Sequence, residues 1–108
     1  MIDYEEFISV DMRVGTIKSA RLNEQARKPA YTLEIDFGDL GIRTSSAQIT
    51  KLYSVQELVG RQVICVVNFP PKQVAGIRSE VLVLGVDSYS GVVLLSLDRP
   101  VANGQRVY

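Results

Sequence analysis

Several residue types that catalysis, metal binding and cross-linking require are scarce or missing from the sequence. Its 108 residues include no His, no Trp and a single Cys. Without His, mechanisms that need an imidazole base or an imidazole ligand are excluded. One Cys can form neither an internal disulfide nor a thiolate zinc site, so the sequence predicts no disulfide scaffold and no metal centre. We therefore expect a binding protein without a cofactor rather than an enzyme.

The sequence also lacks an excess of either charge and any long apolar run. Lys and Arg together number 12, as do Asp and Glu, so the net charge is zero. The longest apolar runs, at 63–67 and 81–86, fall far short of the roughly 20 residues that a membrane helix needs. The first residues are acidic where a secretory signal would be basic, which predicts a cytoplasmic protein.

The zero net charge conceals an uneven distribution. Residues 1–11 hold four acidic and no basic side chains, a charge of −4, so residues 12–108 hold 12 basic and 8 acidic side chains, a charge of +4. The body is therefore mildly basic behind an acidic leader. This polarity keeps a nucleic-acid partner open as an alternative.

The pattern of apolar residues predicts mostly β-strands. Alternation is strict at 31–37, where four apolar side chains share one face. Further strands are expected at 12–22, 42–46, 61–68, 79–86 and 91–97. One or two helical turns are expected within 47–58, with Ser54 as a cap and Gly60 as the stop. A short helix at residues 1–10 precedes the first strand.

This order of elements predicts a small closed barrel. Closure removes the strand edges that would otherwise aggregate, and a helix between the third and fourth of five strands is the arrangement of the OB (oligonucleotide/oligosaccharide-binding) fold. We expect an all-β, five-stranded OB barrel that forms a single domain over residues 1–108. Gly15 is expected to mark a bulge or a close approach within the first long strand.

The residues that might carry catalysis have simpler structural interpretations. Glu34 and Asp36 share one strand face, but their alternation with apolar residues favours a solvated outer face. Cys65 lies inside an apolar run and is expected to be a small buried residue. Ser45 and Ser46 have no imidazole partner anywhere in the chain. The sequence therefore favours binding over catalysis.

A polar loop at 68–79, stiffened by two prolines, is the richest candidate for binding, because long loops in compact barrels are often functional. It contains Asn68, Phe69, Pro70, Pro71, Lys72, Ile77, Arg78 and Ser79. Basic side chains there, with Lys28 and Arg43 elsewhere, could contact phosphates, while Phe69 or Tyr31 could stack on a base. The alternative is a solubilising loop with Phe69 tucked beneath it.

Several blocks of the sequence resemble a known family. The block at 11–17 (DMRVGTI) resembles the opening of the tRNA-binding OB domain, which ends some methionyl-tRNA synthetases and also occurs as free-standing dimers. The blocks at 26–31 (ARKPAY), 45–50 (SSAQIT), 68–71 (NFPP) and 76–85 (GIRSEVLVLG) are similar to the CsaA-type export-related chaperones of the same superfamily. One departure from the tRNA-binding pattern is Glu80-Val81, where that pattern continues with Gly-Met after Ser79.

The resemblance implies a homodimeric chaperone that binds unfolded or preprotein segments in protein export. An apolar groove for the polypeptide is expected near Phe69, Pro70, Pro71, Ile77 and Arg78. The alternative that the superfamily implies is a tRNA or structured-RNA module, with a synthetase-associated scaffold as a third interpretation. Its RNA contacts would come from Lys28, Arg43, Asn68, Lys72, Arg78 and Ser79, although the carboxylate of Glu80 would oppose a phosphate.

The two ends of the chain are expected to form the dimer interface. A helix as short as 1–10 is unstable alone and must pack on something, and the extension at 98–108 carries apolar residues of its own. We expect these two segments to form a two-fold interface, which is self-complementary by symmetry. The alternative is that the helix plugs the open end of its own barrel.

Overall fold

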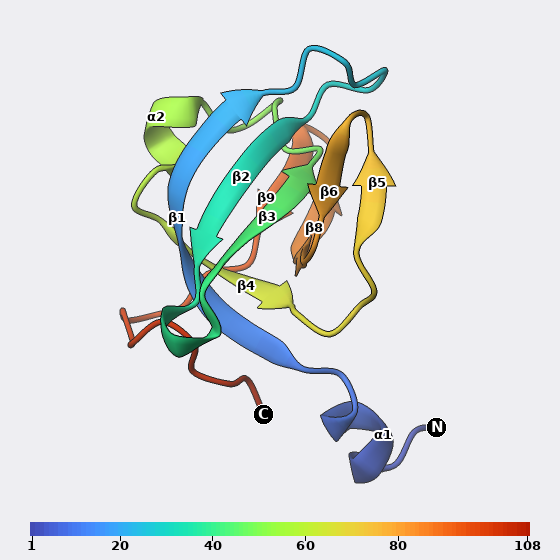
Figure 1. Ribbon diagram of the computed structural model, residues 1–108. Helices are drawn as coiled ribbons and strands as arrows, with labels where there is room; N and C mark the ends of the chain where they lie inside the picture. The colour runs from blue at the N-terminus through green and yellow to red at the C-terminus, as the bar shows by residue number, and fades with distance from the viewer.

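The computed structural model describes residues 1–108, which fold mostly as strands with two small helices (Figure 1). In chain order the elements are α1 (Tyr4–Ile8), β1 (Met12–Leu22), β2 (Tyr31–Asp36), the 3-10 turn η1 (Gly38–Leu40), β3 (Ile42–Ala47), α2 (Val55–Leu58), β4 (Gln62–Val66), β5 (Lys72–Val74), β6 (Ile77–Ser79), β7 (Leu82–Val83), β8 (Gly85–Ser88) and β9 (Gly91–Leu94). The predicted all-β, OB-like fold is confirmed. None of the helices combines the length and the apolar character needed to span a bilayer.

A five-stranded antiparallel sheet in the order β3-β2-β1-β4-β7 curls into the barrel. Gly15 in β1 sits at a close approach, because a Cβ there would lie 2.6 Å from Ile35 Cγ2 and 2.7 Å from the ring of Phe37. The register of β1 against β2 shifts between Ile17 and Ser19, so the bulge falls beyond Gly15. Of the two roles expected for Gly15, the close approach is the one confirmed.

The barrel interior is filled by alternate residues of the strands. In β2 and just after it, Tyr31, Leu33, Ile35 and Phe37 are all buried, which confirms the face read from the alternation at 31–37. Leu58 of α2 is fully buried in the same cluster. The short helix therefore contributes one apolar anchor to the core.

Helix α2 is capped by Ser54 as expected and ends at Leu58, two residues before Gly60. The side chain of Ser54 accepts a hydrogen bond from Glu57 N at 3.2 Å, and Glu57 Oε1 accepts one from Ser54 N at 2.9 Å. This reciprocal pair is a capping box, which stabilises the first turn of a helix too short to persist without tertiary contacts. Gly60 follows with a positive φ of 90°, the conformation expected of a stop.

Two of the predicted segments are wrong in detail. The predicted loop at 68–79 contains the hairpin β5–β6, whose turn at Ala75 and Gly76 has φ values of 46° and 86°. The pair lacks the Asn-Gly or Asp-Gly signal that marks such turns in a sequence. The single strand predicted at 79–86 is divided, because β7 pairs with β4 of the barrel while β8 leaves it to pair with β9.

Both ends of the chain lie at the same end of the molecule (Figure 1). Helix α1 has no buried residue and projects outward, so it does not plug the barrel. The C-terminal segment runs beside β1, where Gly104 N donates to Val14 O at 2.7 Å and Val107 N donates to Met12 O at 2.9 Å. The segment at 98–108 is therefore partly joined to the barrel sheet, while α1 extends away from it.

Candidate binding groove

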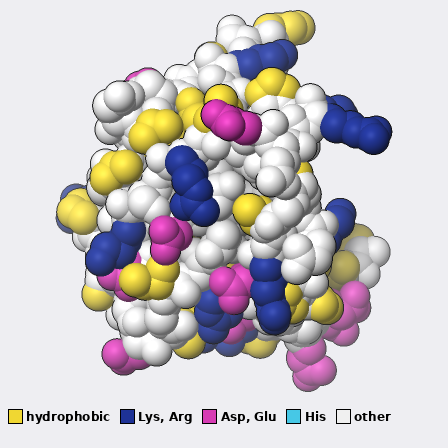
Figure 2. Space-filling model, turned by 45° about the horizontal axis from the view of Figure 1, so that its top comes forward, with side chains coloured by type: hydrophobic (Ala, Val, Ile, Leu, Met, Phe, Trp, Pro, Cys, Tyr) yellow, Lys and Arg dark blue, Asp and Glu magenta, His cyan; other side chains and the backbone are white.

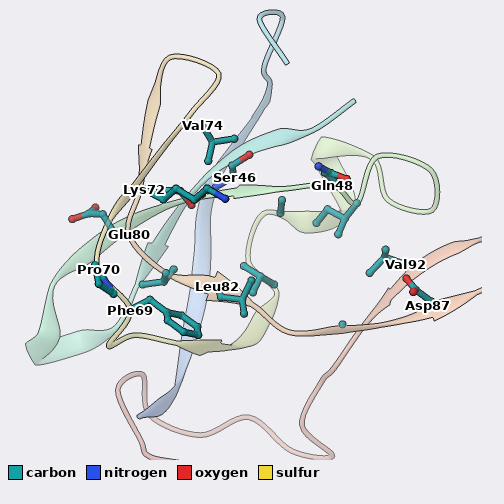
Figure 3. Close-up of a pocket in the computed structure, with 16 residues that line it drawn as sticks. Ser46, Gln48, Phe69, Pro70, Lys72, Val74, Glu80, Leu82, Asp87 and Val92 are labelled. Carbon is teal, nitrogen blue, oxygen red and sulfur yellow. Dashed lines mark hydrogen bonds between the residues drawn. The ribbon is translucent and has the colours of Figure 1, made fainter. Parts of the chain in front are cut away.

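A groove with a volume of about 690 Å³ opens between the end of β3, the β5–β6 hairpin and strands β7 and β8 (Figure 3). The lining residues are Ser46, Ala47, Gln48, Ile49, Phe69, Pro70, Lys72, Val74, Ser79, Glu80, Val81, Leu82, Val83, Gly85, Asp87 and Val92. The groove therefore collects residues from six strands, β3 and β5 to β9, and from the segments that follow β3 and β4. Half of its lining residues are apolar, 8 of 16, as is common in ligand sites.

One end of the groove presents exposed apolar side chains. Phe69 is 54% exposed and Leu82 is 48% exposed. Figure 3 shows Phe69 and Leu82 close to each other at this end, with Pro70 beside Phe69. The exposure of Phe69 contradicts the alternative in which the loop covers it. An aromatic ring held open beside an aliphatic side chain is a typical anchor point for a partner.

The barrel is closed next to the groove by a line of contacts between β3 and residues 79–81, which we call the seam. Ser46 N donates to Ser79 Oγ at 3.0 Å, and Thr44 N donates to Glu80 Oε1 at 3.0 Å. Glu80 N in turn donates to Thr44 O at 2.7 Å. Side chains of residues 79 and 80 thus supply acceptors that a neighbouring strand would otherwise provide.

A fourth hydrogen bond extends the seam into the interior. The hydroxyl of Ser45, which is fully buried, donates to Val81 O at 3.0 Å. A buried hydroxyl without a partner would be costly, so this bond fixes the position of the 79–81 segment.

The charged side chains of the groove differ in how they are held. Glu80 is engaged in the seam, and Figure 3 shows its carboxylate directed away from the cavity. Lys72 is exposed, forms none of the four ion pairs of the structure, and extends across the groove toward Ser46 in Figure 3. Lys72 therefore remains available to a ligand, whereas Glu80 is committed to the fold.

The structure brings together only some of the predicted site residues. Phe69, Pro70, Lys72 and Ser79 line the groove, whereas Pro71, Ile77, Arg78, Arg43 and Asn68 do not. Lys28 lies in an adjoining hollow of about 450 Å³. This second hollow, which we call the lysine hollow, shares Gln48, Asp87 and Val92 with the groove and also contains Lys51 and Tyr89.

The side chain of Asn68 is occupied by the backbone of the N-terminal segment. Its Oδ1 accepts from Asp11 N at 3.0 Å, and its Nδ2 donates to Ser9 O at 2.8 Å. These two bonds hold the start of β1 against the end of β4. A partner that used this amide would therefore have to compete with the fold.

Sequence reasoning missed the far wall of the groove. Gln48, Leu82, Gly85, Asp87 and Val92 all line it. The apolar residues at 81–86 and 92–95 do indicate strands. What the sequence does not reveal is that the chain leaves the barrel at Gly85 and turns this hairpin toward the end of β3.

The groups that might react chemically lie elsewhere. Cys65 is fully buried, and burial raises the pKa of its thiol to about 12, so it stays protonated. Glu34 accepts a hydrogen bond from Ser19 Oγ at 3.0 Å on the outer face of the sheet. No three potential ligands among His, Cys, Asp and Glu come together to hold a metal ion. The groove itself offers apolar contacts, hydrogen bonds and charge.

Comparisons with known proteins agree with this geometry. The family model described as a putative tRNA binding domain matches residues 12–106. The crystal structure of chaperone CsaA from Bacillus anthracis str. Ames is 50% identical, covers 100% of this chain and 99% of its own, and has a TM-score of 0.93. That of the CsaA chaperone protein from Picrophilus torridus is 49% identical, covers 100% of both chains, and has a TM-score of 0.94.

A relative among the curated proteins is much longer. The methionine–tRNA ligase of Pyrococcus furiosus is 35% identical over 106 residues, which is 98% of this chain and 14% of that protein. The chain therefore spans about one seventh of the ligase. The CsaA structures, in contrast, match it from end to end. The resemblance found in the sequence blocks is confirmed.

Proposed function

We propose that this chain, which belongs to the family of putative tRNA-binding domains, acts as a homodimeric chaperone that binds unfolded or preprotein polypeptide segments in its groove. The observation that carries the proposal is the exposed pair of Phe69 and Leu82 at the mouth of the groove. Unfolded chains differ from folded ones chiefly in the apolar side chains that they expose. The similarity to two CsaA chaperones over the whole chain supports the same function.

The charge of the molecule suits a polypeptide better than a polyanion. Figure 2 shows Lys and Arg side chains spread over one face with acidic and apolar side chains among them, and no broad patch of one sign. Apolar contacts between the groove and a client polypeptide would depend only weakly on salt, whereas contacts with phosphates depend on it steeply. We expect the proposed residues Phe69, Pro70, Pro71 and Ile77 to act through apolar contact, and Arg78 through its charge.

The proposed homodimer would use the two ends of the chain. Tyr4 is 65% exposed and Tyr108 is 93% exposed, although both are large side chains with apolar rings. Arg106 Nη2 donates to Ile8 O, which ties the C-terminal segment to the end of α1. Because both segments lie at one end of the molecule (Figure 1), a single two-fold contact could cover them together. Sedimentation of a chain lacking residues 1–10 tests this, and an unchanged dimer would refute it.

A titration with an unfolded, reduced and alkylated client protein tests the polypeptide-binding function. We expect saturable binding that Phe69→Ser weakens by about tenfold, a loss of the order seen for an aromatic interface anchor. The matched control is Ile42→Ser, because Ile42 is 52% exposed but does not line the groove. Binding that is not saturable, or that both variants weaken equally, would count against the groove as the client site.

The family assignment keeps tRNA or structured RNA as a second candidate partner. The proposed contacts are Lys28, Arg43, Asn68, Lys72, Arg78 and Ser79. The seam and the N-terminal contact already employ two of these side chains, those of Ser79 and Asn68. A plot of log affinity for bulk tRNA against log salt separates the two functions. Several phosphate contacts would give a slope of roughly 0.7–0.9 per contact, whereas a flat plot would leave polypeptide as the partner.

The proposal includes a non-enzymatic role in the cytoplasm, in connection with protein export. The structure supports this indirectly, because no thiol lines the groove and the one thiol of the chain, that of Cys65, is buried in the core and protonated. Co-purification from lysate before and after RNase treatment tests the partner class. Retention of polypeptides after RNase treatment is the expected result.

A further inference from the structure

We propose, resting on the polypeptide-binding function above, that the client segment binds as an extended strand added to the free edge of β8. On this proposal, recognition is directed mainly at the backbone of the client, and its side chains add selectivity at the two ends of the groove. Strand addition of this kind supplies affinity through main-chain hydrogen bonds. It also suits a protein that must accept segments of many sequences.

The hydrogen bonding of the β8–β9 hairpin defines which groups face outward. Leu95 N donates to Leu84 O at 3.3 Å, and the strands continue in register from Gly85↔Leu94 to Ser88↔Gly91. In an antiparallel pair, residues that exchange hydrogen bonds alternate with residues that do not. Counting from Leu84, residues 86 and 88 bond to β9, whereas residues 85 and 87 direct their N–H and C=O groups to the opposite edge.

The two outward-facing residues of β8 are the two that line the groove. Gly85 and Asp87 are groove residues, while Val86 and Ser88 are not. No strand pairs with β8 on that side, because β8 and β9 form a two-stranded sheet. The free edge of β8 therefore has unpaired main-chain groups at the two residues that line the groove, and these groups can bond to a further strand.

The opposite wall of the groove repeats this situation at the end of β3. The N–H groups of Thr44 and Ser46 face the free edge of β3 and are taken up by the seam. Gln48, which follows the last residue of β3, lies beyond the seam and lines the groove. Neither the N–H nor the C=O of Gln48 has a hydrogen-bond partner in the chain. The wall opposite β8 thus offers the unpaired backbone groups of a single residue, so most main-chain hydrogen bonds of an inserted segment would be made to β8.

The charges and apolar side chains at the two ends give the client a defined chemistry. Phe69 and Leu82 lie at one end, and Lys28 and Lys51 lie in the lysine hollow that continues the groove at the other. Asp87 is the one carboxylate in the hollow, so two cations face one anion there. Charge complementarity therefore favours a segment whose apolar residues are followed by an acidic residue toward the lysine hollow.

Peptides with selectively blocked backbones test this mode of binding. The probe is a six-residue peptide of alternating Val and Thr with a terminal Asp, together with two isomers that are N-methylated at alternate positions. An added strand presents only every second N–H to its neighbour. We expect one isomer to lose about tenfold or more in affinity and the other to stay within about threefold of the unmodified peptide.

The outcomes separate this inference from the function on which it rests. If the unmodified peptide and an unfolded client protein both fail to bind, the polypeptide-binding function itself is rejected. If the unmodified peptide binds and both isomers bind equally well or equally poorly, the chaperone function stands and strand addition is overturned. If tRNA displaces the peptide and the isomers show no difference, a nucleic acid is the occupant and strand addition is also overturned.

A variant of β8 provides an independent test from the protein side. Asp87→Pro removes an N–H that faces away from β9, a position where an edge strand tolerates Pro. Asp87→Ala is the matched control, since it removes the same carboxylate and keeps the N–H. We expect Asp87→Pro to bind the unmodified peptide about tenfold more weakly than Asp87→Ala, and equal affinities of two folded variants would overturn the proposal. If thermal melts show that Asp87→Pro is unfolded, the N-methylated isomers decide.

Discussion

The free edge of β3 and the segment that follows this strand differ in their hydrogen bonding. Along Thr44 and Ser46 it is closed by the seam, where side chains of residues 79 and 80 accept its N–H groups. At Gln48, just beyond the last residue of β3, the chain is open and forms one wall of the groove. The strand edge is therefore protected from aggregation, while the segment that continues it is left free.

The difference lies in the segment that approaches the edge. At the seam, the chain after β6 comes near enough for main chain and side chains to bond to β3. Beyond the seam, the chain pairs briefly with β4 as β7 and then departs at Gly85 into the β8–β9 hairpin. The groove is the space left by that departure, so a groove residue outside the seam, such as Leu82, can be changed without removing a hydrogen bond of the seam.

The largest effect is expected from breaking the seam. In the double variant Ser79→Ala and Glu80→Ala, the N–H groups of Ser46 and Thr44 lose their acceptors. Leaving a buried or half-buried donor unsatisfied costs about 1–3 kcal/mol each. We expect the free energy of unfolding, measured by urea denaturation, to fall by about 2–4 kcal/mol in total.

A matched double variant distinguishes lost hydrogen bonds from a general effect of the substitutions. Ser96 and Glu24 are exposed, and neither side chain forms a hydrogen bond in the structure. The pair Ser96→Ala and Glu24→Ala should change the free energy of unfolding by less than about 0.5 kcal/mol. A loss of equal size in both double variants would show that the seam does not hold the barrel closed.

At the groove we expect the opposite pattern, a small loss of stability and a large loss of client affinity. Leu82→Ala removes a side chain that is 48% exposed, so the free energy of unfolding should fall by no more than about 1 kcal/mol. Affinity for an unfolded client should fall by about tenfold, because the apolar end of the groove loses one of its two anchors. Isothermal titration calorimetry and urea denaturation of the same sample check both numbers. A large stability loss with unchanged affinity would remove Leu82 from the site.

The core of the barrel could be predicted from the sequence, whereas the seam could not. The core face of β2 and the close approach at Gly15 follow from alternation and from the absence of a side chain. Both are local signals, because the pattern of residues within one segment is enough to predict them. The acceptor roles of Ser79 and Glu80 arise only when the chain returns to β3 from more than 30 residues away, which no local pattern encodes.

The candidate site shows the same division. Phe69, Pro70, Lys72 and Ser79 were found because a proline-stiffened polar segment attracts attention in a sequence, and they do line the groove. The hairpin within that segment was missed, because each strand has three residues and its turn is Ala-Gly. The β8 wall was missed because the strands predicted at 79–86 and 91–97 could equally belong to the barrel or stand outside it.

A substitution in the turn of the β5–β6 hairpin tests whether backbone strain there lowers the stability of the protein. Ala75 has a φ of 46°, which costs a non-glycine residue free energy that Asn tolerates better. Ala75→Asn creates the Asn-Gly pair preferred in such turns, so we expect the unfolding free energy to rise by about 0.5 kcal/mol without loss of client affinity. Ala102→Asn, at an exposed residue outside the hairpin, is the control and should not raise it. Destabilisation by Ala75→Asn would mean that the turn is not the strained element.

Acid titration examines a region that belongs to neither the seam nor the groove, and its effect should be the smallest. The backbone hydrogen bond from Ser54, followed by that from its side chain, lowers the pKa of Glu57 in the capping box of α2. A carboxyl whose pKa is lowered by folding stabilises the protein above its unfolded pKa, about 4.3, and loses that contribution as pH falls through the folded value. The free energy of unfolding should therefore decline between pH 5 and the acid limit less steeply in Glu57→Gln than in the wild type, while at pH 7 the variant is the less stable of the two. Thermal melts across this range check whether the stabilities of the two proteins converge as pH falls, and parallel slopes would show that the capping box does not contribute. Because α2 lies outside the groove, client affinity at pH 7 should be the same in Glu57→Gln and in the wild type. The difference in acid response would then be assigned to the helix rather than to the seam or the groove.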